Sequence, residues 1–177
     1  MRRKFDFSNK GCLVVGASSG LGLEIVKVLL ERGSEIIAAS RDIKSLLMMK
    51  RQLPDKQKNK LHIIKTDVTE PIQLEKLVDF TKDTLDNISL FINTSGIALY
   101  KSFLSLSDSE IKTVIDTNFT GAILLLRKML PIIIRSGGKK CVIQIGSLAG
   151  IKLGHKNFSV YAATKEGLAG LFRSLIP

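Results

Sequence analysis

Short apolar runs alternate with segments of helical periodicity along the whole chain. The runs that predict strands cover residues 11–16, 35–40, 61–66, 88–93 and 141–145. Apolar residues at helical spacing lie between these runs, as in residues 23–32. Strands and helices in alternation favour a parallel sheet with right-handed crossovers. We therefore expect an α/β fold, with a doubly wound parallel sheet of the Rossmann type between two layers of helices.

A glycine-rich turn follows the first apolar run and opens the first predicted helix. Gly16, Gly20 and Gly22 have the spacing GxxxGxG. Glycine lets the backbone approach a pyrophosphate closely, and a helix that begins there presents free N–H groups and the positive end of its dipole. Strand, glycine turn, helix and strand within residues 11–40 are the arrangement of a dinucleotide-binding βαβ unit.

The residues at the end of the second run bear on the choice between NAD and NADP. An acidic residue here would bind the ribose hydroxyls of NAD, whereas this run ends in Ser40-Arg41-Asp42. Arg41 offers several donors to a 2′-phosphate and Ser40 carries no repelling charge, so the segment favours NADP over NAD. Two alternatives remain open. Asp42 holds the ribose if the strand ends later, or Asp42 caps the next helix and Arg41 is solvated.

Tyr161 and Lys165 stand four residues apart in a segment of helical pattern. A helix places both side chains on one face, one turn apart. A free phenol titrates near pH ~10, and a neighbouring ammonium group favours the phenolate form. The pair is therefore a candidate general acid/base, in which Tyr161 moves the proton. The plainer interpretation is a half-buried ring beside a solvated amine.

Three other polar residues stand at predicted strand ends or inside a predicted helix. Ser147 follows the last apolar run, at the carboxyl end where α/β sheets hold ligands. Asp67 follows the third run, where it would accept a hydrogen bond from an adenine amino group or cap a turn. Asn118 lies in a long helical pattern over 111–135, where it would hold backbone or water or be a partly exposed position. Pro131 is expected to bend that helix or to end its regular part.

Several motifs occur in the order typical of one enzyme family. The glycine turn stands where that family has TGxxxGxG, and residues 93–96 read Asn-Thr-Ser-Gly where it has NNAG. Asn118 matches the helix asparagine of the family and Ser147 matches its serine. Tyr161 and Lys165 match its YxxxK motif. In these motifs the chain resembles the short-chain dehydrogenase/reductase family.

The resemblance covers about residues 10–176 and implies an NAD(P)H-dependent oxidoreductase that reduces a carbonyl group or oxidises a secondary alcohol. Tyr161 would then give a proton to the carbonyl oxygen, and Ser147 would hydrogen-bond that oxygen. Lys165 would bind the nicotinamide ribose and keep Tyr161 acidic, and Asn118 would anchor a water molecule. The implied catalytic residues are Asn118, Ser147, Tyr161 and Lys165.

The resemblance also implies the residues that hold the cofactor. Arg41 would bind the 2′-phosphate, Asp67 and Val68 the adenine, and Asn93 the ribose. The implied cofactor residues are Gly16, Ser18, Ser19, Gly20, Leu21, Gly22, Ser40, Arg41, Asp67, Val68, Asn93, Ser95, Gly96, Tyr161 and Lys165.

The length of the chain bounds its organisation. With 177 residues, 45% of them hydrophobic, we expect a single dinucleotide-binding domain over 1–177. Members of the family continue past the Tyr161 helix with further strands and a substrate lid, so this domain would be incomplete at its C-terminus and would lack the last strands of the family. The alternative function is therefore a non-catalytic remnant that binds a dinucleotide or a partner chain.

The net charge and the composition limit the classes of partner that we expect the protein to bind. The net charge of +11 suits an anionic partner, such as a phosphorylated cofactor or an acyl-carrier-linked substrate. The basic residues are scattered without interleaved aromatic residues, which argues against nucleic-acid binding. Two cysteines without metal-ligand spacing indicate a reduced, cytoplasmic protein with no metal site. No run approaches the ~20 apolar residues of a membrane span. The resemblance implies a homo-oligomer.

Overall fold

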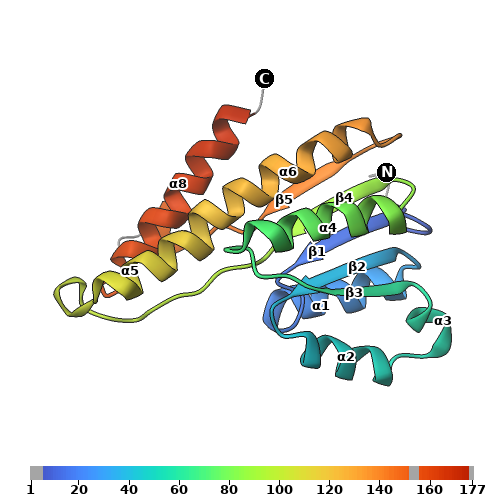
Figure 1. Ribbon diagram of the computed structural model, residues 1–177, viewed down its shortest axis with the longest axis horizontal. Coiled ribbons are helices and arrows are strands. Elements are labelled where there is room, and N and C mark those ends of the chain that lie inside the picture. The colour runs from blue at the N-terminus through green and yellow to red at the C-terminus, as the bar shows by residue number, and fades with distance from the viewer. Residues whose placement is uncertain (1–5, 152–155, 176–177) are drawn as a thin grey trace, which may run out of the picture.

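A parallel sheet forms the centre of the molecule. A computed structural model describes residues 6–151 and 156–175. Within these residues the sheet has five strands in the order β3-β2-β1-β4-β5, and every neighbouring pair is parallel (Figure 1). The strands are β1 (Gly11–Val15), β2 (Glu35–Ser40), β3 (Leu61–Lys65), β4 (Ile88–Asn93) and β5 (Cys141–Gln144). The expected Rossmann-like α/β fold is confirmed, and each predicted strand is present.

Helices cover both faces of the sheet, with α1 and α2 on one face and α4 and α6 on the other (Figure 1). The helices are α1 (Gly20–Glu31), α2 (Ile43–Gln52), α3 (Asp55–Lys58), α4 (Pro71–Thr84), η1 (Phe103–Ser105), α5 (Asp108–Ile115), η2 (Asp116–Thr120), α6 (Gly121–Arg135), α7 (Leu148–Ile151) and α8 (Ser159–Leu175). Pro71 is the first residue of α4, where its missing N–H is not needed. Ser107 and Glu110 form a capping box at the start of α5.

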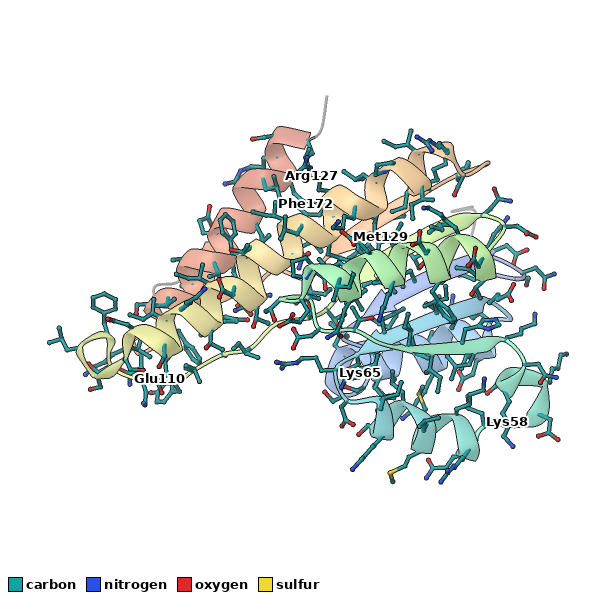
Figure 2. All side chains as sticks on the ribbon, viewed as in Figure 1. Lys58, Lys65, Glu110, Arg127, Met129 and Phe172 are labelled. Carbon is teal, nitrogen blue, oxygen red and sulfur yellow. The ribbon has the colours of Figure 1, made fainter. Side chains whose placement is uncertain are left out.

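Two apolar clusters hold these helices on the sheet, one on each face. Successive strand residues point to opposite faces, so Leu13 belongs to the cluster under α4 and α6, whereas Cys12 belongs to the cluster under α1 and α2. Met129 of α6 is buried in the first cluster and Phe172 of α8 packs against it (Figure 2). Each fully buried aliphatic or aromatic side chain contributes about 1.5–3 kcal/mol, so these clusters supply the main driving force for folding.

The helical pattern over 111–135 does not form one regular helix. It is divided into α5, the π-helical turn η2 and α6. Pro131 lies inside α6, which continues to Arg135. The expectation that Pro131 ends the regular part is therefore wrong. The irregular turn lies earlier, at Asn118, and its physical reason is found in the contacts of that side chain.

One glycine permits the close approach of α1 to the turn before it. Gly22 lies in the first turn of α1, and a Cβ atom there would stand 2.3 Å from the carbonyl oxygen of Gly16 and 2.6 Å from Thr94 Oγ1. Because real Cβ contacts are longer than this, any larger residue would displace the helix from the end of β1. The third glycine of the GxxxGxG pattern is thus required by packing.

Part of the sheet surface beside α1 is not covered by any helix of the described chain. A groove of about 650 Å³ lies there, and its lining is almost wholly apolar, including Leu21, Ile25 and Val28 of α1 and Leu90 and Ile143 of the sheet. Parallel sheets are normally covered on both faces. The layer of helices is therefore incomplete over β4 and β5 in the part of the chain that the structure describes.

The stretch Asp108–Arg135 is, among the described residues, the one helical segment long and apolar enough to cross a membrane, and an 18-residue window within it has a mean hydropathy of 1.4. Leu125, Met129 and Ile133 of this segment are buried against the sheet. A core helix of a globular domain has the same length and composition, so this segment is weak evidence for a membrane span.

Candidate functional site

The order of the strands creates a crevice at one edge of the sheet. The chain passes from β1 to β2 on one side and reaches β4 on the other, so the strand order reverses between β1 and β4. Ligands of open α/β sheets bind at such a point, outside the carboxyl ends of the strands. A cavity of about 320 Å³ lies there. It is lined by Val15, Gly16, Ser18, Ser19, Gly20, Leu21, Gly22, Ser40, Arg41, Thr66, Val68, Thr94, Ser95, Gly96, Thr117 and Ile145.

The glycine turn forms one wall of this cavity. Gly16 and Gly20 have φ angles of 84° and 52°, in the left-handed region that favours glycine. Ser19 is the N-cap residue of α1 but makes no side-chain capping bond. The first N–H groups of α1 are therefore available to an anion, and the helix dipole adds to the attraction. The wall therefore offers uncapped backbone N–H groups, and phosphate binding at this turn stays a prediction.

The end of β2 supplies a serine and an arginine. Ser40 Oγ donates to Ser18 Oγ at 2.7 Å, which joins the end of β2 to the glycine turn. Arg41 also lines the cavity, and its side chain is 56% exposed, with Nη1 4.0 Å from Asp67 Oδ2. Asp42 does not line the cavity. It accepts a hydrogen bond from the Ser45 N–H at 3.1 Å and caps α2, as one of the two alternatives expected.

The side chains of Asp67 and Asn93 make hydrogen bonds to other residues of the protein. Asp67 Oδ1 accepts from the N–H and the hydroxyl of Thr69, so it caps the turn after β3. Asn93 Nδ2 donates to Gln144 Oε1 at 2.9 Å, and its Oδ1 accepts from the N–H of Ser95 at 3.0 Å. Neither residue is among the described residues that line the cavity, whereas Val68, Ser95 and Gly96 are.

Asn118 explains the irregular turn between α5 and α6. Its side chain is fully buried, Oδ1 accepts from the Ile97 N–H at 2.8 Å, and Nδ2 donates to the Ile97 carbonyl at 2.8 Å. The amide therefore satisfies both backbone groups of one residue in the loop after β4. π-Helical turns inside longer helices are frequent at functional sites. The expectation that Asn118 holds backbone is confirmed.

Lys165 lies where α8 meets the end of β5. Only 4% of the residue is exposed, and Nζ donates to the carbonyl of Ile145 at 3.1 Å. Nζ also lies 5.7 Å from the centre of the Tyr161 ring. Burial lowers the pKa of Lys165 from its ordinary value, because the ammonium form loses its hydration. The plainer interpretation, a solvated amine, is wrong for Lys165.

Lys165 and Asn118 converge on a residue of the cavity wall. A Cβ atom on Gly96 would lie 3.2 Å from Asn118 Oδ1 and 3.3 Å from Lys165 Nζ. Ser147 stands two residues after Ile145, and its Oγ accepts from the N–H of Ala149 at the start of α7. The structure thus brings the amine, the amide and the Tyr161 ring to the β4–β5 end of the cavity.

Some residues of the cavity wall were not singled out from the sequence. They are Val15, Thr66, Thr94, Thr117 and Ile145. Each is adjacent to a predicted site residue or ends a predicted strand. Their position next to a motif is the signal by which they could have been found. Which neighbours of a motif line the crevice depends on the direction of each side chain, and a single sequence does not give that direction.

A comparison with models of known protein families identifies the family of the chain. A family model described as short chain dehydrogenase matches residues 10–176. The chain therefore belongs to the short-chain dehydrogenase family, a family of oxidoreductases.

Individual relatives agree with this assignment. Ketoacyl reductase HetN of Nostoc is 34% identical over 161 residues, which are 91% of this chain and 55% of HetN. An uncharacterized oxidoreductase of Staphylococcus haemolyticus is 25% identical over 96% of this chain and 71% of its own length. A short chain dehydrogenase/reductase of Burkholderia phymatum, solved in complex with NAD, superposes with a TM-score of 0.88 at 22% identity, over 97% of this chain and 60% of that chain.

We predict that replacing Lys165 by Met removes a pH dependence from the stability of the fold. The pKa of Lys165 in the folded chain lies below its ordinary value of 10.5. Between those two values the unfolded chain binds more protons than the folded chain, so the free energy of unfolding rises with pH in that window. Urea unfolding from pH 7 to pH 10.5 should show the wild type gaining stability relative to Lys165→Met.

The matched control is Lys76→Met, at an exposed position of α4. This variant should keep a constant difference from the wild type over the same pH range. A difference between wild type and Lys165→Met that does not change with pH would contradict the burial of a charged amine at this position.

Proposed function

We propose that the chain binds a nicotinamide dinucleotide, NADP(H) rather than NAD(H), and that Tyr161 exchanges a proton with the oxygen of a carbonyl or secondary alcohol. One observation carries the proposal. A buried amine, Lys165, lies beside the Tyr161 ring and next to Gly96, and Gly96 lines the same cavity as a glycine turn that can hold phosphates. A candidate phosphate site and an acid/base pair beside one crevice fit a dinucleotide-dependent reaction.

The residues of the cavity fit the parts of such a cofactor. The free N–H groups at the start of α1, with Ser18 and Gly20, suit the pyrophosphate. Arg41 is half exposed at the end of β2 and suits a 2′-phosphate. Gly96 and Ile145 line the end nearest to Lys165, where the nicotinamide would lie. When bound, the cofactor supplies or accepts the hydride.

The side chains of the protein would move and hold the proton. Tyr161 would donate its hydroxyl proton to the substrate oxygen in the direction of reduction, and Ser147 would hydrogen-bond the same oxygen. Lys165 would favour the phenolate by its charge, and its Nζ would reach the ribose hydroxyls near Gly96. Asn118 would keep the loop after β4 in place through Ile97.

The family and one relative support the proposed substrate class. HetN is named a ketoacyl reductase, which supports a carbonyl substrate for this chain. An acyl-carrier-linked form of the substrate, a homo-oligomer and a cytoplasmic location stay predictions. The chain spans 55% of HetN and 60% of the Burkholderia protein, so turnover by this chain is part of the proposal.

The second candidate is dinucleotide binding without turnover. The uncovered apolar groove over β4 and β5 favours it, because the sheet beneath the nicotinamide end lacks a helix layer in the described chain. Under this candidate, NADPH binds but no carbonyl compound is reduced.

We predict that NADPH binds more tightly than NADH and that Arg41→Ala removes this preference. A charged hydrogen bond is worth about 1.5–3 kcal/mol, which corresponds to a loss of roughly 10- to 100-fold in NADPH affinity. The affinity for NADH should be nearly unchanged, because it has no 2′-phosphate. Fluorescence titration of the reduced nicotinamide measures both, with Arg51→Ala on the exposed side of α2 as the control. Equal affinities in the wild type would refute the NADP preference.

Replacing Tyr161 by Phe should abolish turnover and leave NADPH affinity within about two-fold. General acid/base catalysis contributes roughly 10²- to 10⁴-fold to a rate, and Phe lacks the proton. A panel of ketones and acyl ketones followed by NADPH absorbance gives the measurement. The control is Tyr100→Phe, at a 64% exposed tyrosine outside the proposed catalytic set. Wild-type turnover in Tyr161→Phe would remove that residue from the mechanism.

A further inference from the structure

One face of α2 is exposed along its whole length. Residues three, four and seven positions apart lie on the same side of a helix. The outward face of α2 follows this spacing and consists of Lys44, Leu47, Met48 and Arg51. Leu47 is 43% exposed and Met48 is 59% exposed, although both are large apolar side chains. Figure 1 shows α2 at the outer margin of the molecule. This face therefore presents two apolar side chains between two basic ones.

The surroundings of this face are basic. Residues 41–60 contain seven Lys and Arg residues but only two acidic residues, Asp42 and Asp55. Both carboxylates already have a local role, since Asp42 caps α2 and Asp55 pairs with Lys58 at 3.0 Å. The two basic residues of the outward face make no ion pair within the described part of the chain. Their charge is therefore available to an anionic partner.

The inner face of α2 limits the shape of that partner. Leu46 is fully buried and Met49 is 7% exposed, in the apolar cluster that holds α2 on the sheet. Lys50 also turns inward, and its Nζ donates to the carbonyl of Leu61 on β3. A protein that encloses a basic amphipathic helix contacts it on all sides, and α2 would have to leave the sheet to be enclosed. The partner therefore approaches α2 from the outside only.

We propose that the outward face of α2 binds the surface of an anionic lipid bilayer. The face is the convex side of a helix, so Leu47 and Met48 can enter the boundary between headgroups and acyl chains without a matching groove. Lys44 and Arg51 stand about 10 Å apart along the helix and can reach lipid phosphate groups at both ends of the face. Lys56, which follows in α3, adds to the attraction. This surface is separate from the proposed dinucleotide site and does not depend on it.

The test measures how much of the chain sediments with sucrose-loaded vesicles. One preparation is phosphatidylcholine with about one third phosphatidylglycerol, which is anionic, and the other is phosphatidylcholine alone. The charge variant, Lys44→Gln with Arg51→Gln, removes both basic groups of the outward face. The apolar variant, Leu47→Gln with Met48→Gln, removes the side chains that would enter the bilayer and keeps the charge. Glutamine is a good helix former, so both variants should keep α2 folded.

The control variant removes the same charge at another place. Arg127→Gln with Arg135→Gln changes two exposed residues of α6, which lies on the other face of the sheet from α2, and Figure 2 shows Arg127 far from α2. Exposed charges further apart than ~8 Å are largely screened at physiological salt, so this variant should bind the anionic vesicles within about three-fold of the wild type. All three variants should melt within about 2 °C of the wild type, because the replaced side chains are exposed.

The expected results separate a lipid-binding face from general attraction by charge. The wild type should sediment with the anionic vesicles and not with phosphatidylcholine alone. The charge variant should bind the anionic vesicles roughly 25-fold more weakly, because each basic residue near such a surface contributes about five-fold. The apolar variant should bind them roughly 10-fold more weakly, because it has no apolar side chain to insert.

Three outcomes would overturn the proposal. If the wild type binds soluble polyglutamate but not the anionic vesicles, or binds neither, the face does not bind lipid. If the α6 control loses as much binding as the charge variant, binding follows the net charge of +11 and not this face. If the apolar variant binds as the wild type does, no side chain of this face enters the bilayer. Should the melting curve show that one α2 variant is unfolded, the other α2 variant decides alone.

Discussion

The Thr94 side chain makes the contact on which the arrangement of this site depends. Its Oγ1 lies 2.9 Å from the carbonyl oxygen of Val15 and 3.1 Å from that of Gly16, and its N–H donates to Val15 at 2.8 Å. These bonds join the end of β4 to the end of β1, where the strand order reverses. A Cβ atom on Gly16 would lie only 2.5 Å from Thr94 Oγ1, and one on Gly22 only 2.6 Å from it. The Thr94 hydroxyl can therefore pack against the turn only because both positions are glycine, and this contact fixes the start of α1 beside the crevice.

A second set of contacts fixes the other end of the crevice. Asn118 holds both backbone groups of Ile97, and Lys165 holds the carbonyl of Ile145. The loops after β4 and β5 are thus each tied to a helix by one buried polar side chain. Removing the partner of a buried amide or amine costs far more free energy than removing a surface contact, so these bonds stabilise the two loops as well as the fold.

Much of this fold could be predicted from local patterns. The buried central strands and the glycine turn depend on residues close in sequence, and the alternation of strands and helices left few topologies. The π-helical turn could not be predicted, because it exists to let Asn118 reach a loop 21 residues earlier in the chain. The partner of Asn93 could not be predicted for the same reason, because Gln144 lies 51 residues later and is reached only across neighbouring strands. Asp67 differs, since its partner Thr69 is local and turn capping was one of its two predicted roles.

We expect a dinucleotide to bind at the carboxyl ends of these strands. The opposite edge of the sheet offers a competing site, a polar hollow of about 630 Å³ lined by Lys10, Asn87, Lys139 and others. Amide chemical shifts of the ¹⁵N-labelled chain, recorded as NADPH is added, distinguish the two edges. We predict that the amide signals of Gly20 and Thr117 shift while those of Asn87 and Lys139 do not. Shifts confined to Asn87 and Lys139, or none at all, would contradict it.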